Sequence, residues 1–574
     1  MTGALLQLVA MGNQDTFFNG NPQISFFKCV FKKYSNFAIE SKFVNFDSVQ
    51  YLNYEQPTRL FVNLPKYGEL LSKIYFEFTL PDIYSSVNRK FNWIDSIGTS
   101  IINYVKFYIN DTLIEKIEGE YMSIYFNNLL SDDKLVTYNK IIGNVDNIKK
   151  STGKIDNKYF DSKFNQNIPT IIGRKIIVPI PLWFTKYGGQ ELPIISLDKS
   201  KIQIEIELKA INKLYTVIEK KELVLENSLD IDGNIIDHSG EKKMSNNNEI
   251  LYEDNTINYE HRTPPLKKTD EIKYFLESNE NNFWPLKPKL NVEYVYLDEQ
   301  EKKIIKSMDH QYLIERVQNS EFIGLYNDEI IELRLFNPTK ELYMVPYRDD
   351  IIENNQFTNF SNLDYNGQEE HIYNYQNHIL HQISSIPGAD LSKIGLFRTD
   401  KDRTTDLKID KTELNIDEDR YIESDQAMTI DDISELLKVW SHRDINDIPA
   451  INADNYTYFT PNIIESIEIK FNGDVRQASR DNSYYENVVP YIHHSNRIDG
   501  VLVYSFSLNP EKYQPSGACN FSNIKDAILE IKFKNTSRYE SKGKKNMKYN
   551  MKIYNTTYNI LKIYDNTCQL LFST

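Results

Sequence analysis

Cysteine is scarce in this chain, and its scarcity excludes two kinds of architecture. Only 3 of the 574 residues are cysteines, and Cys29, Cys519 and Cys568 lie far apart in the sequence. Neither a dense disulfide framework nor a paired Cys-x-x-Cys metal site can be built from them. The sequence therefore favours a chain that is made in a reducing compartment.

Basic residues are also in deficit. The chain has 66 Lys and Arg against 81 Asp and Glu, which gives a formal net charge of −15 and an isoelectric point near 5.3. Binding to duplex DNA depends on Lys and Arg side chains that neutralise phosphates. This balance argues against a surface that wraps DNA, and we expect no direct contact with nucleic acid.

The amino-terminal apolar run is too short to cross a membrane. Residues 1–11 are mostly apolar, but no basic leader precedes them and the polar residues 13–15 follow. A membrane-spanning helix needs about 20 apolar residues, and a signal peptide needs a basic start. We expect this segment to be an arm, either flexible or docked under a neighbouring subunit or near a membrane.

Motifs of catalysis and nucleotide binding are missing as well. The sequence contains no P-loop, HExxH or GxSxG pattern. Ser516-Gly517 is not a nucleophile elbow, because Gln514 and Ala518 stand where the elbow requires glycine. We interpret this segment as a turn.

Histidines and acidic residues give no better metal site. His378 and His381 have helical ligand spacing and lie near His371, but no cysteine is close, and His493-His494 stands apart. Residues 230–233 begin like a calcium loop, with the glycine at the wrong place. We therefore predict no catalytic, cofactor-binding or metal-binding residues.

Aromatic residues and strict alternation are what the chain does have. It contains 39 Tyr and 30 Phe, which favour strands. In residues 201–208 every second side chain is apolar, which places the aliphatic set on one face of a sheet and the charges on the other. The same pattern recurs at 73–80, 105–109, 331–335 and 467–471. These segments predict antiparallel strands buried on one face.

The strand landmarks occur twice in the same order, which indicates an internal duplication. Residues 61–66 parallel 335–340, and 106–111 parallel 469–474, where a strand runs into an Asn-containing tight turn. The final strand pairs are 202–208 with 290–297 in the first half, and 529–533 with 558–563 in the second. Two similar sandwiches in tandem account for this order.

Unequal spacing of the landmarks predicts long insertions in the loops. We place them at about 144–167, 217–282 and 347–461. Within the last, Ile433, Leu436, Leu437 and Trp440 have helical spacing, with Asp431 or Asp432 as the cap. A further short helix that begins with acidic residues is expected near residue 300, between the two sandwiches.

One long motif near the carboxyl end resembles a known family. Residues 504–522 read YSFSLNPEKYQPSGACNFS, which is similar to the signature of the double jelly-roll major capsid proteins of nucleocytoplasmic large DNA viruses. Further segments that resemble this family are 12–15, 20–28, 32–38, 294–298 with 312–318, and 337–342. The chain departs from the family at Asn337, where His is common, and at Tyr343, where Trp is common. The segment 568–573 also lacks the usual glycines.

The resemblance implies a fold and an architectural function. The expected class is all-β, with two tandem eight-stranded antiparallel jelly rolls, long loop insertions and a few short helices. The predicted division is an arm at 1–27, a first jelly roll at 28–300, a linker helix at 301–311 and a second jelly roll at 312–574.

By the same resemblance, the chain is not an enzyme and needs no cofactor. The resemblance also implies that it forms homotrimeric, pseudo-hexagonal capsomers in the icosahedral shell of the virion, and that these are assembled in the host cytoplasm. Its expected partners are itself, neighbouring capsomers, minor capsid and penton proteins, and internal membrane-associated proteins.

Two alternatives stay open. One is a minor capsid paralogue of the same fold. The other is a carbohydrate-binding or glycoside-acting β-sandwich protein, for which duplicated jelly rolls are neutral evidence. Sequons that could carry glycans occur at Asn110, Asn359, Asn455, Asn520, Asn535 and Asn555.

Overall fold

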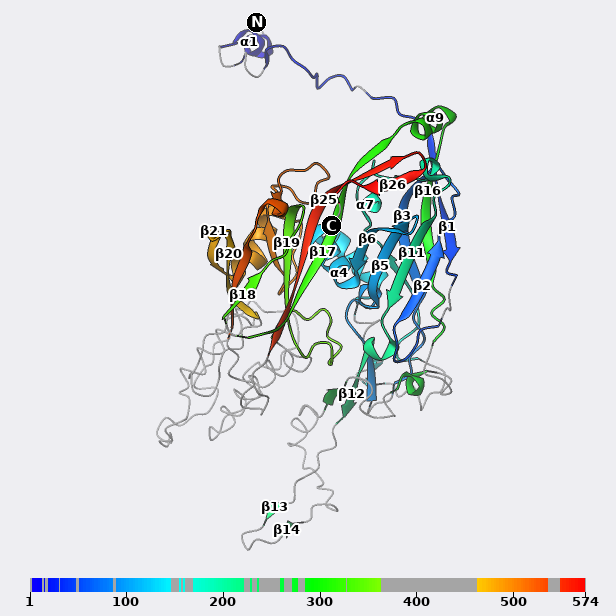
Figure 1. Cartoon of the computed structure of the whole chain (residues 1–574), viewed down its shortest axis with the longest axis vertical. Helices are drawn as coiled ribbons and strands as arrows, with labels where there is room; N and C mark the ends of the chain where they lie inside the picture. Colours follow the sequence, from blue (N-terminus) through cyan, green and yellow to red (C-terminus); the bar gives the residue numbers. More distant parts are fainter. Residues whose placement is uncertain are drawn as a thin grey trace.

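Two β sandwiches lie side by side in the computed structural model of the chain (Figure 1). The described residues span 3–572, and the segments left out are 13–14, 16–18, 30, 48–50, 86–88, 146–153, 156–157, 160–168, 221–227, 230–234, 237–258, 263–270, 277–283, 327, 363–461 and 535–547. In Figure 1 the long strands β17 and β25 run between the two sandwiches, and the amino-terminal arm leaves the body beside helix α9.

The first sandwich is made of two antiparallel sheets. The β1 sheet has the order β1-β16-β3-β10, and β9 also pairs with β3. The β2 sheet has the order β2-β11-β5-β6. The strands are β1 (Phe37–Asn45), β2 (Thr58–Asn63), β3 (Leu70–Thr79), β5 (Ile102–Ile109), β6 (Thr112–Glu118), β9 (Lys175–Pro179), β10 (Leu192–Pro193), β11 (Ile202–Leu208) and β16 (Lys289–Leu297).

The second sandwich repeats this order. The β17 sheet runs β17-β25-β19-β22, with β23 on β19 and β26 on β25, and the β18 sheet runs β18-β24-β20-β21. The strands are β17 (His310–Leu325), β18 (Asp328–Glu332), β19 (Pro338–Arg348), β20 (Ile464–Phe471), β21 (Asp474–Asp481), β22 (Leu502–Ser505), β23 (Cys519–Asn520), β24 (Ala527–Phe533), β25 (Tyr549–Tyr564) and β26 (Thr567–Leu570). Strands β1, β16 and β3 of the first sandwich therefore have the same order as β17, β25 and β19 of the second, and the β2 sheet has the same order as the β18 sheet. The predicted double jelly roll is confirmed.

The paired landmarks of the sequence fall at matching places in the two sandwiches. Residues 106–111 and 469–474 both form the turn of an edge hairpin, β5-β6 in one sandwich and β20-β21 in the other. Asn110 and Asp111 have positive φ, as do Asn472 and Gly473, which is the backbone of a tight hairpin turn.

Burial alternates along β2 but not along β11. In β2 every second residue is buried, as period-two patterning predicts. In β11 the charged face is covered too, because Tyr104 donates to Glu205 Oε1 at 2.9 Å and to Glu207 Oε2 at 2.9 Å, and Arg59 Nε donates to Glu207 Oε2 at 2.7 Å. The acidic side chains of this strand are therefore buried in a polar network rather than solvated.

Short helices connect the strands. They are α1 (Gly3–Val9), α3 (Ile97–Ser100), α4 (Gly119–Leu129), α5 (Asp132–Ile142), α7 (Trp183–Lys186), α9 (Glu299–Ser307) and α12 (Val489–His493), with the π-helix η8 (Tyr484–Val488) before α12 and the 3-10 turns η1 (Ile194–Leu197), η2 (Ile211–Lys213), η4 (Ile272–Phe275) and η9 (Phe521–Asn523). No helix of the described residues is long and apolar enough to span a bilayer.

Helix α9 connects the last strand of the first sandwich, β16, to the first strand of the second, β17, and lies at one end of the first sandwich (Figure 1). Asp298 caps it, since its carboxylate accepts from the backbone N–H groups of Gln300 and Glu301 at 3.1 and 2.8 Å. The helix begins two residues before the predicted start of the linker at 301, and strand β17 already begins at His310. The predicted end of the linker helix, residue 311, is too late, because His310 and Gln311 already belong to β17 and pair with β25. The division of the chain into domains stays a prediction.

Part of one predicted insertion forms a third, smaller sheet. Its order is β15-β12-β4, from β15 (Tyr259–Arg262), β12 (Tyr215–Lys220) and β4 (Arg89–Trp93). Two further hairpins pair β7 (Lys154–Ile155) with β8 (Lys158–Tyr159) and β13 (Ser228–Leu229) with β14 (Ile235–Ile236). The helix expected around Ile433 lies outside the described residues.

Candidate assembly surfaces

The outer face of the β17 sheet packs against the first sandwich, and we call this contact the seam. Tyr343, Val345 and Tyr554 belong to the same apolar cluster as the core of the first sandwich. Leu342 and Met344, on the other face of the sheet, belong to the separate core of the second sandwich. Strand β19 is therefore buried on both faces, and the seam face of its sheet is continuous with the apolar interior of the first sandwich.

Buried charges pair across the seam. Lys340 Nζ lies 2.6 Å from Glu315 Oε1, and Lys186 Nζ of the first sandwich lies 3.4 Å from Glu315 Oε2. Lys340 also donates to the carbonyl oxygen of Pro510 at 2.7 Å. The carboxyl-terminal sequence motif is thus tied to the centre of the seam by its first proline.

Electrostatics keep these groups ionised despite their burial. Burial alone would raise the pKa of Glu315, but the ammonium groups of Lys340 and Lys186 outweigh it and hold that pKa below its usual value. Burial would likewise lower the pKa of Lys340, but Glu315 and Glu341 raise it well above the usual value. Each charge is stable because its partner is present.

The paired histidines lie near this cluster. His494 Nε2 is 3.4 Å from Glu341 Oε2, and its Nδ1 is 3.5 Å from Glu511 Oε1. His493 Nδ1 is 3.1 Å from the carbonyl oxygen of Leu508. Among the described residues no group of three or more His, Cys, Asp or Glu is arranged to hold a metal. His371, His378, His381 and residues 230–233 lie outside the described residues.

Glu115 is a buried acid of the seam, and only one of its two carboxylate oxygens has a hydrogen-bond partner. Its Oε2 accepts from the backbone N–H of Trp183 at 2.9 Å, and its Oε1 is buried without a hydrogen-bond partner. Burial raises the pKa of Glu115 to about 7, although the nearby charge of Lys186 acts in the opposite direction. The pKa of this carboxyl therefore lies close to neutral pH.

A second charged row connects strand β6 and helix α4 to the β17 sheet. Asn319 Nδ2 donates to Glu118 Oε1 at 2.7 Å. Lys552 Nζ donates to Glu120 Oε2 at 2.7 Å, and the hydroxyl of Tyr554 donates to Glu118 Oε2 at 3.0 Å. The end of β6 and the start of α4 are therefore fixed to the second sandwich by charge-assisted bonds.

Ser516 is part of a turn. Its Oγ accepts from the backbone N–H of Asn509 at 2.8 Å and lies 2.7 Å from Ser507 Oγ. Gly517 has a φ of +139°, and a Cβ there would lie 2.6 Å from the carbonyl oxygen of Phe506. These contacts close the loop between β22 and β23, and Ser516 has a structural role in them.

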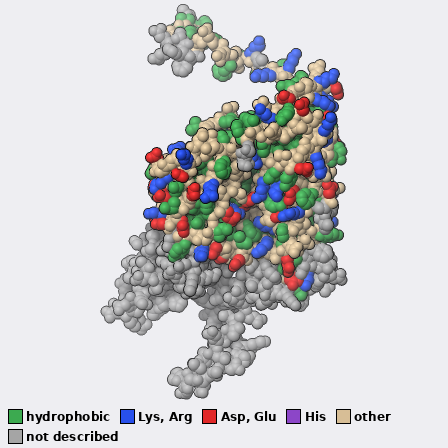
Figure 2. Space-filling model, in the orientation of Figure 1, with side chains coloured by type: hydrophobic (Ala, Val, Ile, Leu, Met, Phe, Trp, Pro, Cys, Tyr) green, Lys and Arg blue, Asp and Glu red, His purple; other side chains and the backbone are tan. Residues whose placement is uncertain are grey.

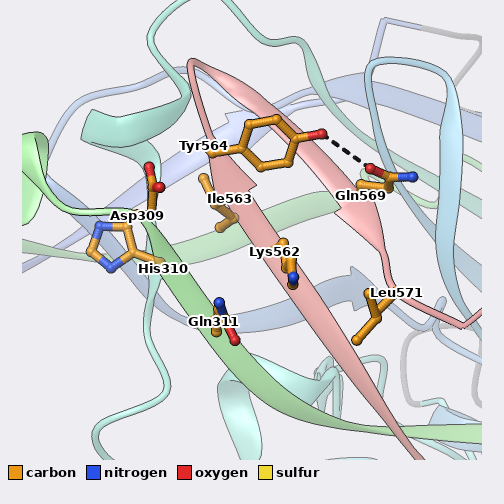
Figure 3. A pocket seen from close by; sticks show the side chains of 8 residues that line it. All are labelled: Asp309, His310, Gln311, Lys562, Ile563, Tyr564, Gln569 and Leu571. Carbon is orange, nitrogen blue, oxygen red and sulfur yellow. Dashed lines mark hydrogen bonds between the residues drawn. The ribbon is translucent and has the colours of Figure 1, made fainter.

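A pocket of about 320 Å³ opens beside the linker helix (Figure 3). It is lined by Asp309, His310, Gln311, Lys562, Ile563, Tyr564, Gln569 and Leu571. The hydroxyl of Tyr564 donates to Gln569 Oε1 at 3.0 Å, and His310 Nε2 lies 2.8 Å from the carbonyl oxygen of Ile305. Three of the lining side chains, those of His310, Tyr564 and Gln569, therefore hydrogen-bond within the protein.

Exposed apolar side chains gather in the amino-terminal arm. Helix α1 has no buried residue, and large apolar side chains along the arm are exposed, namely Leu5, Leu6, Leu8, Val9, Met11, Ile24, Phe26 and Phe27. On the body, Figure 2 shows apolar side chains scattered among charged ones. Such a segment lacks the burial that would stabilise it within its own chain, as expected of an arm that docks elsewhere.

Sequence reasoning did not find the seam charges. Glu315 and Lys340 both lie inside motifs that resemble the capsid family, at 312–318 and 337–342. The sequence did contain a signal for them, because a charged residue at the centre of an otherwise strand-like segment needs a partner of opposite charge if it is buried.

One of the glycosylation sequons is closed to modification in the folded chain. Asn555 has no exposed surface, so it is not an acceptor in the folded chain.

Comparison with known proteins decides the family. A family described as "Major capsid protein N-terminus" matches residues 25–249, and one described as "Large eukaryotic DNA virus major capsid protein" matches residues 301–568. The chain belongs to the major capsid protein family of large eukaryotic DNA viruses. In this capsid-family chain the second match begins at residue 301, within helix α9.

Relatives and solved structures agree with this assignment. The chain is 25% identical to the major capsid protein of Phaeocystis pouchetii virus, over all of both chains. It is also 25% identical to "Probable capsid protein 4" of Acanthamoeba polyphaga mimivirus, over 100% of this chain and 99% of the relative.

Two solved structures share the fold. The Faustovirus major capsid protein has a TM-score of 0.54 at 12% identity, covering 96% of this chain and 94% of that one. A PBCV-1 virus capsid chain has a TM-score of 0.54 at 18% identity, covering 96% and 100%.

Proposed function

We infer that this chain is a major capsid protein, which self-assembles into homotrimeric capsomers that tile the icosahedral shell of a large DNA virus. The observation that carries the inference is the duplicated sandwich in a chain matched by the capsid family over residues 25–249 and 301–568. Three chains with two similar sandwiches each supply six similar units, the outline that a hexagonal lattice needs.

The finer parts of the proposal concern partners and chemistry. The capsomer contacts neighbouring capsomers, minor capsid and penton proteins, and its arm contacts proteins at an internal membrane. Assembly takes place in the host cytoplasm, and the chain catalyses no reaction. The exposed apolar side chains of the arm support a docking role.

A lower-copy paralogue is the second candidate. Relatives from one virus, Acanthamoeba polyphaga mimivirus, carry two different capsid-protein names, "Probable capsid protein 4" and "Capsid protein 1". A virus of this kind therefore has more than one capsid protein of this family. Quantitative mass spectrometry of purified virions separates the candidates, because the major protein outnumbers every other shell protein.

Light scattering coupled to size exclusion tests the trimer. The expected mass is three times the chain mass of 67.4 kDa, with an interface of about 2,000 Å² or more, as permanent assemblies bury. A chain that stays monomeric at high concentration and physiological salt contradicts the proposal. Binding to a glycan array without self-association would favour the carbohydrate-binding alternative.

A further inference from the structure

One histidine lies where a surface turn meets the seam. The turn is residues 506–518, between β22 and β23, and its Glu511 lies beside His494, the residue that follows α12. His494 also faces Glu341 of strand β19. A strand of the seam, the end of a helix and a surface turn therefore meet at a single imidazole ring.

Each ring nitrogen of His494 faces a carboxylate oxygen. Nε2 lies 3.4 Å from Glu341 Oε2 and Nδ1 lies 3.5 Å from Glu511 Oε1, and the His494 side chain is only 2% exposed. His494 Nε2 and Glu341 Oε2 are both buried without a hydrogen-bond partner. A neutral imidazole has one donor and one acceptor nitrogen, whereas the imidazolium ion has two donors. Only the protonated ring can therefore donate to both carboxylates.

The neighbouring groups on β19 supply little of the positive charge that these carboxylates need. Lys340 Nζ lies 3.5 Å from Glu341 Oε1, but it lies closer, at 2.6 Å, to Glu315 Oε1, so one ammonium group serves two acids. The ring of Tyr343 lies 6.0 Å from that of His494. Tyr343 is neutral, because burial and then the charge of Glu341 hold the pKa of Tyr343 well above its usual value.

On the turn, Glu511 has neutral donors besides His494. The backbone N–H of Ser495 donates to Glu511 Oε1 and the Ser495 hydroxyl donates to Oε2, both at 2.7 Å. Burial raises the pKa of Glu511, but the hydrogen bonds from His494 and Ser495 outweigh burial and hold that pKa below its usual value. Glu511 is therefore ionised over the range of about pH 5 to 8, in which histidine side chains change charge.

We propose that His494 is a proton-controlled clamp on the turn at 506–518. When His494 is protonated, it donates to Glu341 and Glu511 together and holds the turn against β19. When its proton passes to solvent as the pH rises, one of these two bonds is lost, while the neutral bonds of Ser495 persist. The clamp goes beyond the proposed function, because its three residues belong to one chain and act whether or not copies associate.

The clamp controls a segment that solvent reaches. Leu508 is 72% exposed and Tyr513 is 42% exposed, so the mobility of a surface turn follows the pH. The clamped state binds a proton that the released state lacks, so low pH favours the clamp. We expect the contact to be complete below about pH 6.5, where ordinary histidines are charged, and to be lost as the pH rises further.

Hydrogen exchange of the full chain, followed by mass spectrometry at pH 6 and pH 8.5, tests the clamp. The protection of the turn is the intrinsic exchange rate at each pH divided by the measured rate, which removes the chemical effect of pH. For wild type we expect the protection of residues 506–518 to fall about tenfold between pH 6 and pH 8.5, as the loss of one charge-assisted hydrogen bond predicts.

His494→Gln tests whether the charge is responsible. Glutamine keeps one donor and one acceptor group but takes up no proton in this range, so the turn should have the low protection at both pH values. Glu115 also titrates, with a pKa of about 7, but it is present in both chains, so its effect cancels in the comparison.

His493→Gln is the matched control. His493 is the adjacent residue and its Nδ1 also contacts the turn, but it faces the carbonyl oxygen of Leu508 at 3.1 Å rather than a carboxylate. A neutral imidazole can donate to a carbonyl oxygen as well as an imidazolium can reach it. The His493→Gln chain should therefore keep the tenfold fall of wild type.

Glu511→Gln tests the clamp from the other side, and it decides the question if His494→Gln does not fold. The side chain of Glu511 is 23% exposed, so a neutral amide of the same shape is tolerated there. This change removes one of the two charges that bind the imidazolium, and most of the fall in protection should disappear.

The outcomes are distinct from those that test the trimer. Equal protection of the wild-type turn at the two pH values overturns the clamp, and so does a full tenfold fall in His494→Gln or in Glu511→Gln. A fall in wild type and His493→Gln that is absent from His494→Gln supports it. Light scattering at both pH values reports the mass of the assembly separately, so a monomeric chain contradicts the proposed function and leaves this result valid.

Discussion

Lys340 has three partners and almost no access to solvent. Its ammonium group contacts Glu315, Glu341 and the carbonyl oxygen of Pro510. Replacing it with methionine keeps the length of the side chain and removes the charge. Two buried carboxylates then lose a partner, and we expect a loss of about 3–5 kcal/mol in the free energy of unfolding, measured by urea denaturation at fixed chain concentration.

A matched control for this prediction is Lys302→Met. Lys302 forms an ion pair of similar length with Glu69, at 2.6 Å, but its side chain is 35% exposed. Solvent-screened pairs contribute little to stability, so we expect a much smaller loss here than at Lys340. Equal losses at the two positions would show that the charges of the seam are as well solvated as those of the surface.

Glu115 predicts a dependence of stability on pH. Its folded pKa of about 7 lies above the model-compound value of 4.5, so between these pH values the folded chain holds a proton that the unfolded chain has released. The stability from this proton is fully present below pH 4.5 and is lost as pH rises through 7. Glu115→Gln stays neutral, so we expect it to gain stability over wild type at pH 8 and little at pH 5.

The size of this gain follows from the shift. One pKa unit corresponds to about 1.4 kcal/mol, so the variant should exceed wild type by about 3 kcal/mol at most at pH 8, measured by denaturant unfolding at both pH values. Glu332→Gln, at an exposed position on β18, serves as the control and should leave the pH profile unchanged. A gain that is equal at pH 5 and pH 8 would contradict the assignment.

Helix α4 depends on a glycine at its first position. A Cβ on Gly119 would lie 2.2 Å from the carbonyl oxygen of Ile102 and 2.3 Å from that of Thr99, and both are backbone atoms that cannot move aside. Gly119→Ala should therefore displace the helix and its contacts with β25, at a cost of about 1–3 kcal/mol or more. Gly188→Ala, where no atom lies within 4 Å, should change the unfolding free energy by about 0.5 kcal/mol or less.

Strands with one buried face could be predicted from the sequence, and strands in the seam could not. Period-two patterning at 105–109 and 467–471 locates β5 and β20, because a solvated face keeps its polar residues. Strand β25 breaks the pattern: Asn555, Thr556, Thr557 and Asn559 are all buried within it. The residues that bury them belong to the other sandwich and to β17, which are distant in the sequence. A pattern within β25 itself therefore cannot reveal their burial.

The same limit applies to the assembly surfaces. The motif at 504–522 identifies the family, and the twofold order of landmarks predicts two sandwiches. Which face of each sandwich meets the other depends on the packing of α4 and α7 on the β17 sheet, a contact between residues more than a hundred positions apart. The exposed Tyr491 is therefore distinguishable from a buried tyrosine only in the folded chain.

The arm contributes nothing to the stability of the folded body. Within the described part of residues 1–27, no residue is buried. A chain that lacks residues 1–27 should unfold within about 2 °C of the full chain, since about 1 kcal/mol is needed for a larger shift. Thermal unfolding followed by circular dichroism measures this, and a markedly lower midpoint would show that the arm packs on the body of its own or another copy.

The continuous interior across the seam has a mechanical consequence. Tyr343, Val345 and Tyr554 of one sandwich share an apolar cluster with the core of the other, so bending the chain at α9 would open that core to water. Close-packed interiors resist such deformation. Each chain is therefore a stiff unit, and the curvature of a shell built from such units has to come from the contacts between chains rather than from bending within a chain.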